Sequence, residues 1–321
     1  MMEESQVLFT LFSLPVTRYA ACVAGAIAMG LLLLAWEQKK AGLRADTAEV
    51  FALLTLPLGL LCGRAFYCLA RWQVYQEMGL THILHLWEGG YALWGVVGGC
   101  VLAAVLTARI THQRTAKVLD ALTVPGAITL ALCRFAELTC GEGIGMEVEM
   151  PLFQRFPFAV YDADWEVWFW AICVLEGVTA LVIAAVLMVH RRFTVAGHRA
   201  RLMGILYCSA QLLLESLRRD NFLRWLFVRV SQLTAALVLG GMMLFALYRW
   251  TKTPAARRRS ARWLCVHWVV FLVGVGICIA MEFAVDKSAT LPVWLCYTVM
   301  AACCAAMGVT AYRLTLRYAS E

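Results

Sequence analysis

Long apolar runs recur along the whole 321-residue chain, and they constrain its fold more than any other feature. A helix that crosses the hydrocarbon core of a bilayer needs about 20 mainly apolar residues. Runs of this kind predict nine spans, at 18–36, 50–70, 91–108, 121–139, 166–189, 202–217, 230–248, 264–284 and 290–311. With 62% hydrophobic and 15% charged residues, the composition excludes both an ordinary soluble enzyme and a disordered chain. We therefore expect an all-α integral membrane protein.

Basic residues are unevenly divided between the two sets of loops. The loops after the spans at 18–36, 91–108, 166–189 and 230–248, together with the C-terminal tail, hold 18 Lys and Arg residues, whereas the opposite set holds 7. Cytoplasmic loops retain basic residues, so we expect an outward N-terminus and a cytoplasmic C-terminus in a bacterial inner membrane. The net charge of +7 then reflects topology, and we expect no nucleic-acid partner. Residues 1–6 carry two Glu and no basic residue, so we expect the first span to be retained and not cleaved as a signal peptide.

The chain divides by composition into two parts. The densest basic loop precedes the last two spans, which contain few polar groups. We therefore expect a membrane domain at 1–250 with seven spans and an appended two-helix hairpin at 251–321. The thirteen cysteines form no CxxC pair and most lie in apolar runs, so we expect no disulfide framework, no zinc or other metal site, and no cofactor.

Several ionisable side chains lie within or beside the spans, where each costs about 2.5–3.5 kcal/mol. They are Arg64, Arg134, Glu137, Glu142, Glu176, Glu215 and Arg218. Arg134–Glu137 and Glu215–Arg218 are three residues apart, so each can form a local helical pair. One interpretation is that these pairs are structural salt bridges. The other is that the three arginines meet in the outer half of the membrane and hold a phospholipid phosphate, which a guanidinium fork matches, with the carboxylates as orienting groups or proton acceptors.

A glycine-rich segment opens the span at 91–108. It contains Glu88, Gly89 and Gly90, followed by Gly95 and Gly99. The Gly95–Gly99 spacing is typical of close helix packing. The functional alternative is that these glycines let lipid or backbone approach Glu88.

Several motifs in a fixed order resemble the prolipoprotein diacylglyceryl transferase family. They are GRAFY (63–67), WEGGYALWG (87–95), the stretch 120–125, RFAELTCGEGIG (134–145), ESLR (215–218) and SQL (231–233). The resemblance covers roughly residues 10–250. It implies seven core helices and an inner-membrane enzyme that moves the diacylglyceryl group of phosphatidylglycerol, or of a related anionic phospholipid, onto the lipobox cysteine thiol of a prolipoprotein.

The resemblance and the intramembrane charges together predict the site. Arg134 matches the arginine at the end of the family's fourth helix and Arg218 the one that ends the sixth, while Tyr19 matches a tyrosine of the first helix. The expected catalytic residues are Arg134, Arg218, Glu137 and Glu142. The expected substrate-binding residues are Arg64, Tyr19, Glu88, Gly89, Gly90, Gly141, Gly145 and Glu215.

The sequence also departs from the family pattern. The family's His-Gly-Gly is Trp94-Gly95-Val96, its asparagine after the arginine is Glu137, and its polar segment before the fifth helix is replaced by an aromatic stretch at 165–170. Glu137 is then the first candidate for the base, ahead of His85 and His82. These departures leave a second hypothesis, a non-catalytic relative that binds phospholipid or lipoprotein. A third, a transporter, predicts internal repeats, and none is visible.

Overall fold

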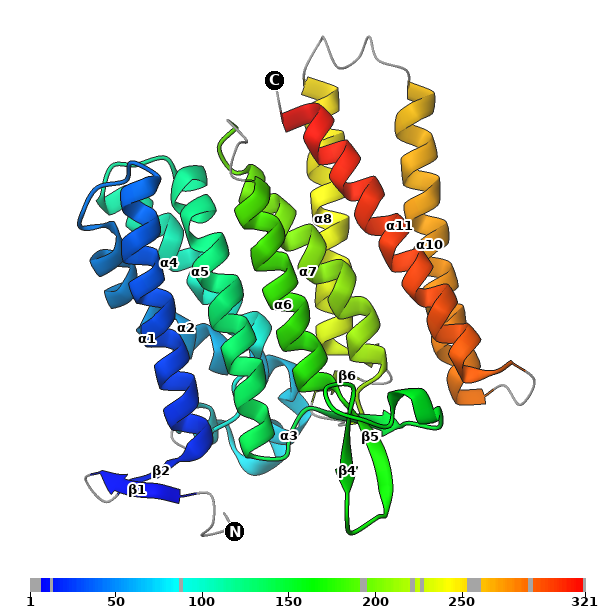
Figure 1. Cartoon of the computed structure of the whole chain (residues 1–321). Coiled ribbons are helices and arrows are strands. Elements are labelled where there is room, and N and C mark those ends of the chain that lie inside the picture. Colours follow the sequence, from blue (N-terminus) through cyan, green and yellow to red (C-terminus); the bar gives the residue numbers. More distant parts are fainter. Residues whose placement is uncertain are drawn as a thin grey trace. The chain divides into compact units, whose positions relative to one another are not determined.

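The computed structural model describes residues 7–11, 14–86, 89–190, 195–219, 223–225, 228–252, 261–287 and 291–319. Helices dominate these segments (Figure 1). Within them, eight helices are long and apolar enough to cross a membrane. They are α1 (Arg18–Lys40), α2 (Thr47–Ala70), α4 (Leu93–Ile110), α5 (Thr115–Ala136), α6 (Ile172–Val189), α8 (Val230–Lys252), α10 (Ala261–Lys287) and α11 (Val293–Ala319). The chain is thus an all-α, multi-pass integral membrane protein, as the sequence predicts.

Two of the nine predicted spans differ in the structure. The stretch at 202–217 does fold as a helix, α7 (His198–Ser216), but α7 is more polar than the eight spans and is not among them. The span expected at 166–189 begins later in the structure, because residues Val167–Ala171 form strand β5 and α6 begins at Ile172. This strand is made almost entirely of valine, tryptophan and phenylalanine, which favour extended backbone.

A small three-stranded sheet lies in the chain between α5 and α6. It consists of β3 (Ile144–Glu147), β4 (Ala159–Asp162) and β5, in the order β3-β5-β4 with antiparallel pairing. Short elements complete the described chain. They are β1 (Val7–Leu11), β2 (Leu14–Thr17), α3 (Trp72–Met78), η2 (Leu80–Leu84), η4 (Glu137–Thr139), η5 (Pro151–Phe153), β6 (Arg224–Trp225) and β7 (Val228–Arg229).

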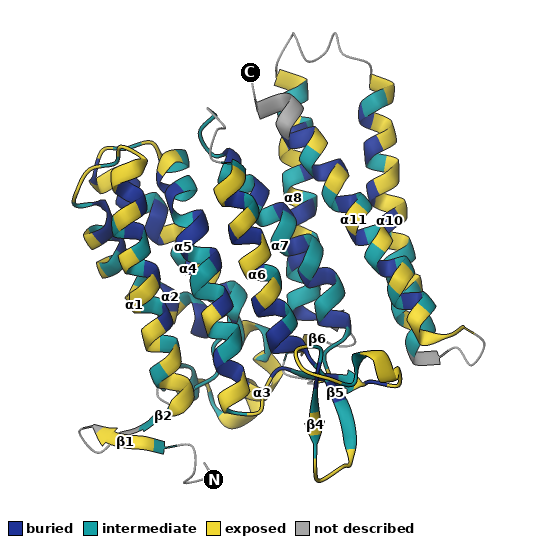
Figure 2. Ribbon diagram, viewed as in Figure 1, coloured by how far each residue is buried: buried dark blue, intermediate teal, exposed yellow. Residues whose placement is uncertain are grey.

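The chain forms two compact units. The first comprises Met1–Arg191 and Arg218–Ser231, and the second comprises Arg192–Leu217 and Gln232–Glu321. In the first unit α2 packs on α4, α1 on α5, and α5 on α6; in the second, α11 packs on α10 and α7. The predicted division into residues 1–250 and 251–321 stays a prediction. Large apolar side chains such as Leu32, Leu53 and Val182 are exposed, and exposed positions run along α1 (Figure 2), as expected for helices that face lipid.

The Gly95–Gly99 pair packs α4 closely against α2, which confirms the packing interpretation. A Cβ atom on Gly95 would lie 2.4 Å from the carbonyl oxygen of Cys62, and one on Gly99 would lie 2.4 Å from that of Leu58. Neither side chain can be added unless the backbones separate. This contact fixes the first unit around α2 and α4.

We expect Gly99→Ala to lower the stability of the folded protein in detergent by about 1–3 kcal/mol, the usual cost of overpacking. The matched control is Gly98→Ala on the same helix, where a Cβ atom would meet nothing within 4 Å. Both changes gain the same helix propensity, so thermal unfolding of the two variants isolates the packing cost. Equal melting temperatures would show that the α2–α4 contact is not tight.

Candidate functional site

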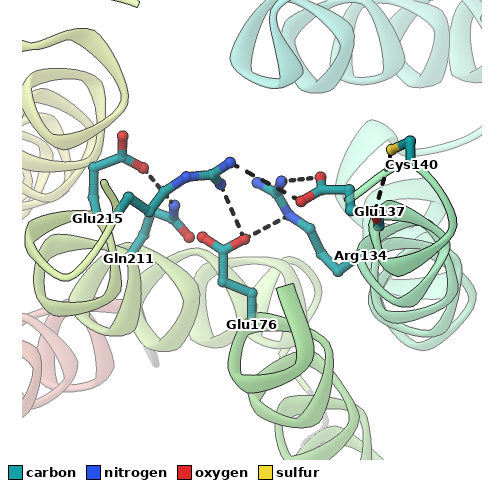
Figure 3. Close-up of polar contacts among 7 residues, drawn as sticks. Arg134, Glu137, Cys140, Glu176, Gln211 and Glu215 are labelled. Carbon is teal, nitrogen blue, oxygen red and sulfur yellow. Dashed lines mark hydrogen bonds and ion pairs between the residues drawn. The ribbon is translucent and has the colours of Figure 1, made fainter. Parts of the chain in front are cut away.

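Arg134 and Arg218 come together within the first unit, although they are far apart in sequence. Arg134 lies in the last turn of α5, directly before η4. Arg218 lies two residues beyond the end of α7, in the segment that returns to the first unit. Figure 3 shows Arg134 facing Glu137 and Glu176, with the ion pairs drawn as dashed lines. These four side chains form what we call the paired-arginine cluster: Arg134, Arg218, Glu137 and Glu176.

Each carboxylate of the cluster faces both guanidinium groups. Arg134 Nη1 lies 2.5 Å from Glu137 Oε1, which confirms the predicted local pair, and Arg134 Nε lies 2.9 Å from Glu176 Oε2. Arg218 Nη1 lies 3.4 Å from the same Glu176 oxygen, and Arg218 Nη2 lies 4.0 Å from Glu137 Oε2. Two positive and two negative charges therefore balance within the cluster.

Glu176 is the most deeply buried member, with 1% of its side chain exposed, against 11–12% for the other three. A carboxylate at this depth is costly unless cations neutralise it, and Glu176 has both arginines. The sequence marks Glu176 as a charge inside an apolar run, but Glu176 is not among the site residues expected from the sequence. The signal that identifies it is this isolated acidic residue within α6, because such residues usually face a protein interior or a polar cavity.

Two glycines bring the members of the cluster close enough to interact. A Cβ atom on Gly177 would lie 2.3 Å from the ring of Phe135, so α6 can approach α5 beside Glu176 only because residue 177 is glycine. Gly143 has φ of +72°. A Cβ atom there would lie 2.6 Å from Glu137 Oε2 and 2.7 Å from Cβ of Cys173.

The loop after η4 surrounds Glu137. The backbone N–H of Glu142 and the thiol of Cys140 both donate to the carbonyl oxygen of Glu137, at 3.2 Å each. The side chain of Glu142 is exposed, as is Gly141, whose φ is +70°. Burial raises the pKa of the Cys140 thiol, so this thiol stays protonated at neutral pH. Gly145, on β3, is buried and pairs through its backbone with Arg218.

Tyr19 lies in the first turn of α1, near the cluster. Helix α1 contacts η4, and Tyr19 is close enough to Glu137, Cys133 and Cys140 to interact with them electrostatically. Its side chain is 38% exposed. Tyr19 therefore lies at the edge of the cluster, where a ligand from solvent or lipid can reach it.

Arg64, expected as a third member, is engaged by a different part of the chain. Its guanidinium donates to the carbonyl oxygens of His82 (2.6 Å), Ile83 (3.3 Å), Gly89 and Gly90 (3.5 Å). A Cβ atom on Gly90 would lie 2.9 Å from Nη1 of Arg64, so this glycine allows the close approach. Arg64 thus holds η2 and the glycines Gly89 and Gly90 that follow it.

The remaining expected residues are Glu88, Glu215 and the two candidate bases. Glu88 is outside the described residues. Glu215 is buried in the second unit, where Gln211 Nε2 donates to its Oε2 at 3.1 Å (Figure 3). The candidate base His82 lies in η2 and His85 directly follows it, with their rings 5.0 Å apart and edge to face.

We expect Glu176→Gln to destabilise the first unit by about 3 kcal/mol, because it leaves two buried guanidinium groups with one carboxylate between them. The matched control is Glu149→Gln, at an exposed position of the loop between β3 and η5. Denaturant or thermal unfolding in detergent measures the difference. Equal stability of the two variants would mean that Glu176 does not hold the arginines together.

We expect Gly143→Ala to be more harmful than Gly141→Ala. Both glycines have a positive φ, so both variants carry the same left-handed backbone strain, about 1–2 kcal/mol. A Cβ atom on Gly141 meets nothing within 4 Å, whereas one on Gly143 collides with Glu137. Unfolding measurements on the two variants would therefore show an additional loss of stability in Gly143→Ala alone. Similar losses of stability in both variants would contradict this packing.

Comparison with known proteins gives a consistent result. The family model described as prolipoprotein diacylglyceryl transferase matches residues 6–248. Three relatives carry the name phosphatidylglycerol–prolipoprotein diacylglyceryl transferase. The one from Listeria innocua is 24% identical over 249 residues (75% of this chain and 88% of the relative). The one from Mycobacterium tuberculosis is 28% identical over 281 residues (77% of this chain and 57% of the relative). The one from Clostridioides difficile is 25% identical over 167 residues (50% of this chain and 67% of the relative).

The extent of these matches is uneven. The alignment with the mycobacterial relative spans little more than half of that protein's length. The family model, in contrast, covers every element of the first unit that contributes to the paired-arginine cluster. The chain belongs to the prolipoprotein diacylglyceryl transferase family.

Proposed function

We propose that the protein transfers the diacylglyceryl group of phosphatidylglycerol to the lipobox cysteine of a prolipoprotein. The observation that carries this proposal is the convergence of Arg134 and Arg218, from separate segments of the first unit, on Glu176. Relatives in three bacterial genera carry this activity in their names. On the topology predicted from basic residues, the cluster lies toward the outer leaflet, where the lipid headgroup would be.

Phosphate binding requires an exchange of partners in the cluster. A phosphodiester carries one negative charge and matches the two-donor face of a guanidinium group. Because the cluster is already neutral, the phosphate takes the place of one carboxylate. Glu137 is the better candidate to leave, since its side chain is 12% exposed and that of Glu176 is 1% exposed. Glu176 stays and keeps the arginines together.

The displaced carboxylate then has a chemical role. Glu137, with the exposed Glu142 as a second acceptor, takes the proton of the substrate thiol. The thiolate sulfur attacks the glyceryl carbon that is bonded to the phosphate oxygen, a C–S bond forms, and the C–O bond breaks. Glycerol phosphate leaves with the electron pair of that bond. Arg134 and Arg218 stabilise the negative charge on the leaving phosphate.

A second candidate function is phospholipid binding without transfer. It is favoured by Trp94, which stands where the family has a histidine, and by the pairing of both arginines with carboxylates. In this case the protein would bind phosphatidylglycerol and leave the lipobox thiol unmodified.

One experiment separates the two functions. Purified protein is incubated with phosphatidylglycerol vesicles and a lipobox peptide, and the peptide is analysed by mass spectrometry. Transfer predicts a diacylglyceryl mass increase on the cysteine, together with release of glycerol phosphate. Bound phospholipid with an unmodified peptide would support the second function and overturn the first.

We expect Arg134→Ala and Arg218→Ala each to lower kcat/KM by about 100- to 1000-fold, the loss typical of removing a charge-stabilising donor. Lysine at either position should recover little, because a point charge lacks the planar two-donor fork. Arg155→Ala serves as the control, since Arg155 is exposed and belongs to the same unit. Near-normal activity in either alanine variant would exclude that arginine from phosphate binding.

A further inference from the structure

Arg218 does not lie within a helix, which sets it apart from Arg134. Helix α7 ends at Ser216, and the next regular element in the described chain is β6, at Arg224. A side chain on such a segment is held less firmly than one on a helix or strand. Arg218 nevertheless contacts two carboxylates that lie on regular elements, Glu137 on η4 and Glu176 on α6. Its backbone must therefore be restrained by neighbouring groups.

One restraint comes from a buried arginine that the proposed reaction does not use. Arg229, at the end of β7, is 8% exposed. Its Nη2 donates to the carbonyl oxygen of Arg218 at 2.7 Å. A hydrogen bond from a charged donor is stronger than one between neutral groups. This contact leaves the side chain of Arg218 directed at Glu137 and Glu176.

Arg229 is itself held by a short hairpin. Strands β6 and β7 pair antiparallel, with Arg224 opposite Arg229 and Trp225 opposite Val228. The backbone N–H of Val230 donates to the carbonyl oxygen of Leu223 at 3.1 Å and closes the base of the hairpin. Arg229 therefore reaches Arg218 from a paired strand.

The other side of Arg218 is restrained by β3. Arg218 pairs with Gly145, and the backbone N–H of Arg219 donates to the carbonyl oxygen of Ile144 at 3.3 Å. The guanidinium of Arg219 also lies over the ring of Phe169, at 4.9 Å from its centroid. The Arg218 backbone is thus held between β3 on one side and Arg229 on the other.

We infer that Arg229 is a positioning residue for Arg218 in the transfer reaction. This inference rests on the proposed function. Arg229 acts through the backbone of Arg218 and needs no contact with substrate. A misplacement of about 1 Å at a reacting site can cost about 100-fold in rate, so loss of the tether lowers turnover without removing a group that touches the phosphate.

The test compares three variants in the full chain. Arg229→Met keeps much of the side-chain volume and removes the donors, whereas Arg229→Lys keeps the charge and a single donor nitrogen. Arg224→Met removes the same charge from the opposite strand of the same hairpin, at an exposed position. We expect Arg229→Met to lower kcat by about 10- to 100-fold, Arg229→Lys to recover part of this loss, and Arg224→Met to behave as wild type.

A coupled variant separates positioning from general stability. If Arg229 acts through Arg218, then Arg229→Met has little further effect in an Arg218→Lys background. If Arg229 only stabilises the fold, the reductions in kcat caused by Arg229→Met and Arg218→Lys multiply. A multiplicative result, or equal kcat in Arg229→Met and Arg224→Met, would overturn the inference.

Hydrogen exchange gives a readout that does not need turnover. Arg229→Met should speed exchange of the Arg219 amide, which pairs with Ile144, while Arg224→Met should not. Unchanged exchange would overturn the inference even if activity falls. If the wild-type protein transfers no lipid, the proposed function fails, and the exchange result alone then decides whether Arg229 holds Arg218.

Discussion

The cluster depends on one oxygen atom, Glu176 Oε2, which faces a guanidinium nitrogen of both Arg134 and Arg218. Two arginines close together repel each other strongly where water is excluded, because Coulomb energies rise as the dielectric constant falls. The buried carboxylate between them removes that repulsion. The fold supports this arrangement with small residues: Gly177 lets α6 approach α5, and Gly143 makes room for Glu137. Close packing at the two glycines and the ion pairs therefore both position the four residues of the paired-arginine cluster.

A neutral cluster suits a protein that binds an anionic lipid and then releases an anionic product. If the arginines stood unpaired, they would bind glycerol phosphate as firmly as the lipid, and release would be slow. Because Glu137 competes for the arginines, the binding free energy of each anion is only the difference between its own interaction with the arginines and that of the Glu137 carboxylate. The competition also links lipid binding to the exposure of Glu137, so that a proton acceptor becomes available when phosphate is bound. Lipid binding with displacement of Glu137 and release of the anionic product are both part of the proposed function.

The sequence predicts the parts of this site that are local or that depend on composition. The Gly95–Gly99 contact and the Arg134–Glu137 pair are confirmed because each follows from helical spacing. The Glu176–Arg218 contact joins residues 42 positions apart, and no periodicity connects them. The three-stranded sheet and the bridge between Gly145 and Arg218 do not follow from the sequence, because the strands have only four or five residues and the paired residues lie far apart along the chain. Arg64 was grouped with the other arginines by charge and depth alone, and neither shows that backbone carbonyls surround it.

Two departures from the family pattern support each other. The resemblance to the family implies a histidine at position 94 and an asparagine at position 137; this chain has Trp94, which cannot accept a proton, and Glu137, which can. An asparagine amide beside Arg134 would leave the cluster with one carboxylate for two arginines. Glu137 supplies the second negative charge and places a proton acceptor one helical turn from the arginine that would bind phosphate. A single substitution thus changes both the charge balance of the site and the group available to activate the thiol. A loss of the histidine alone would instead be expected to leave binding intact and chemistry without a base.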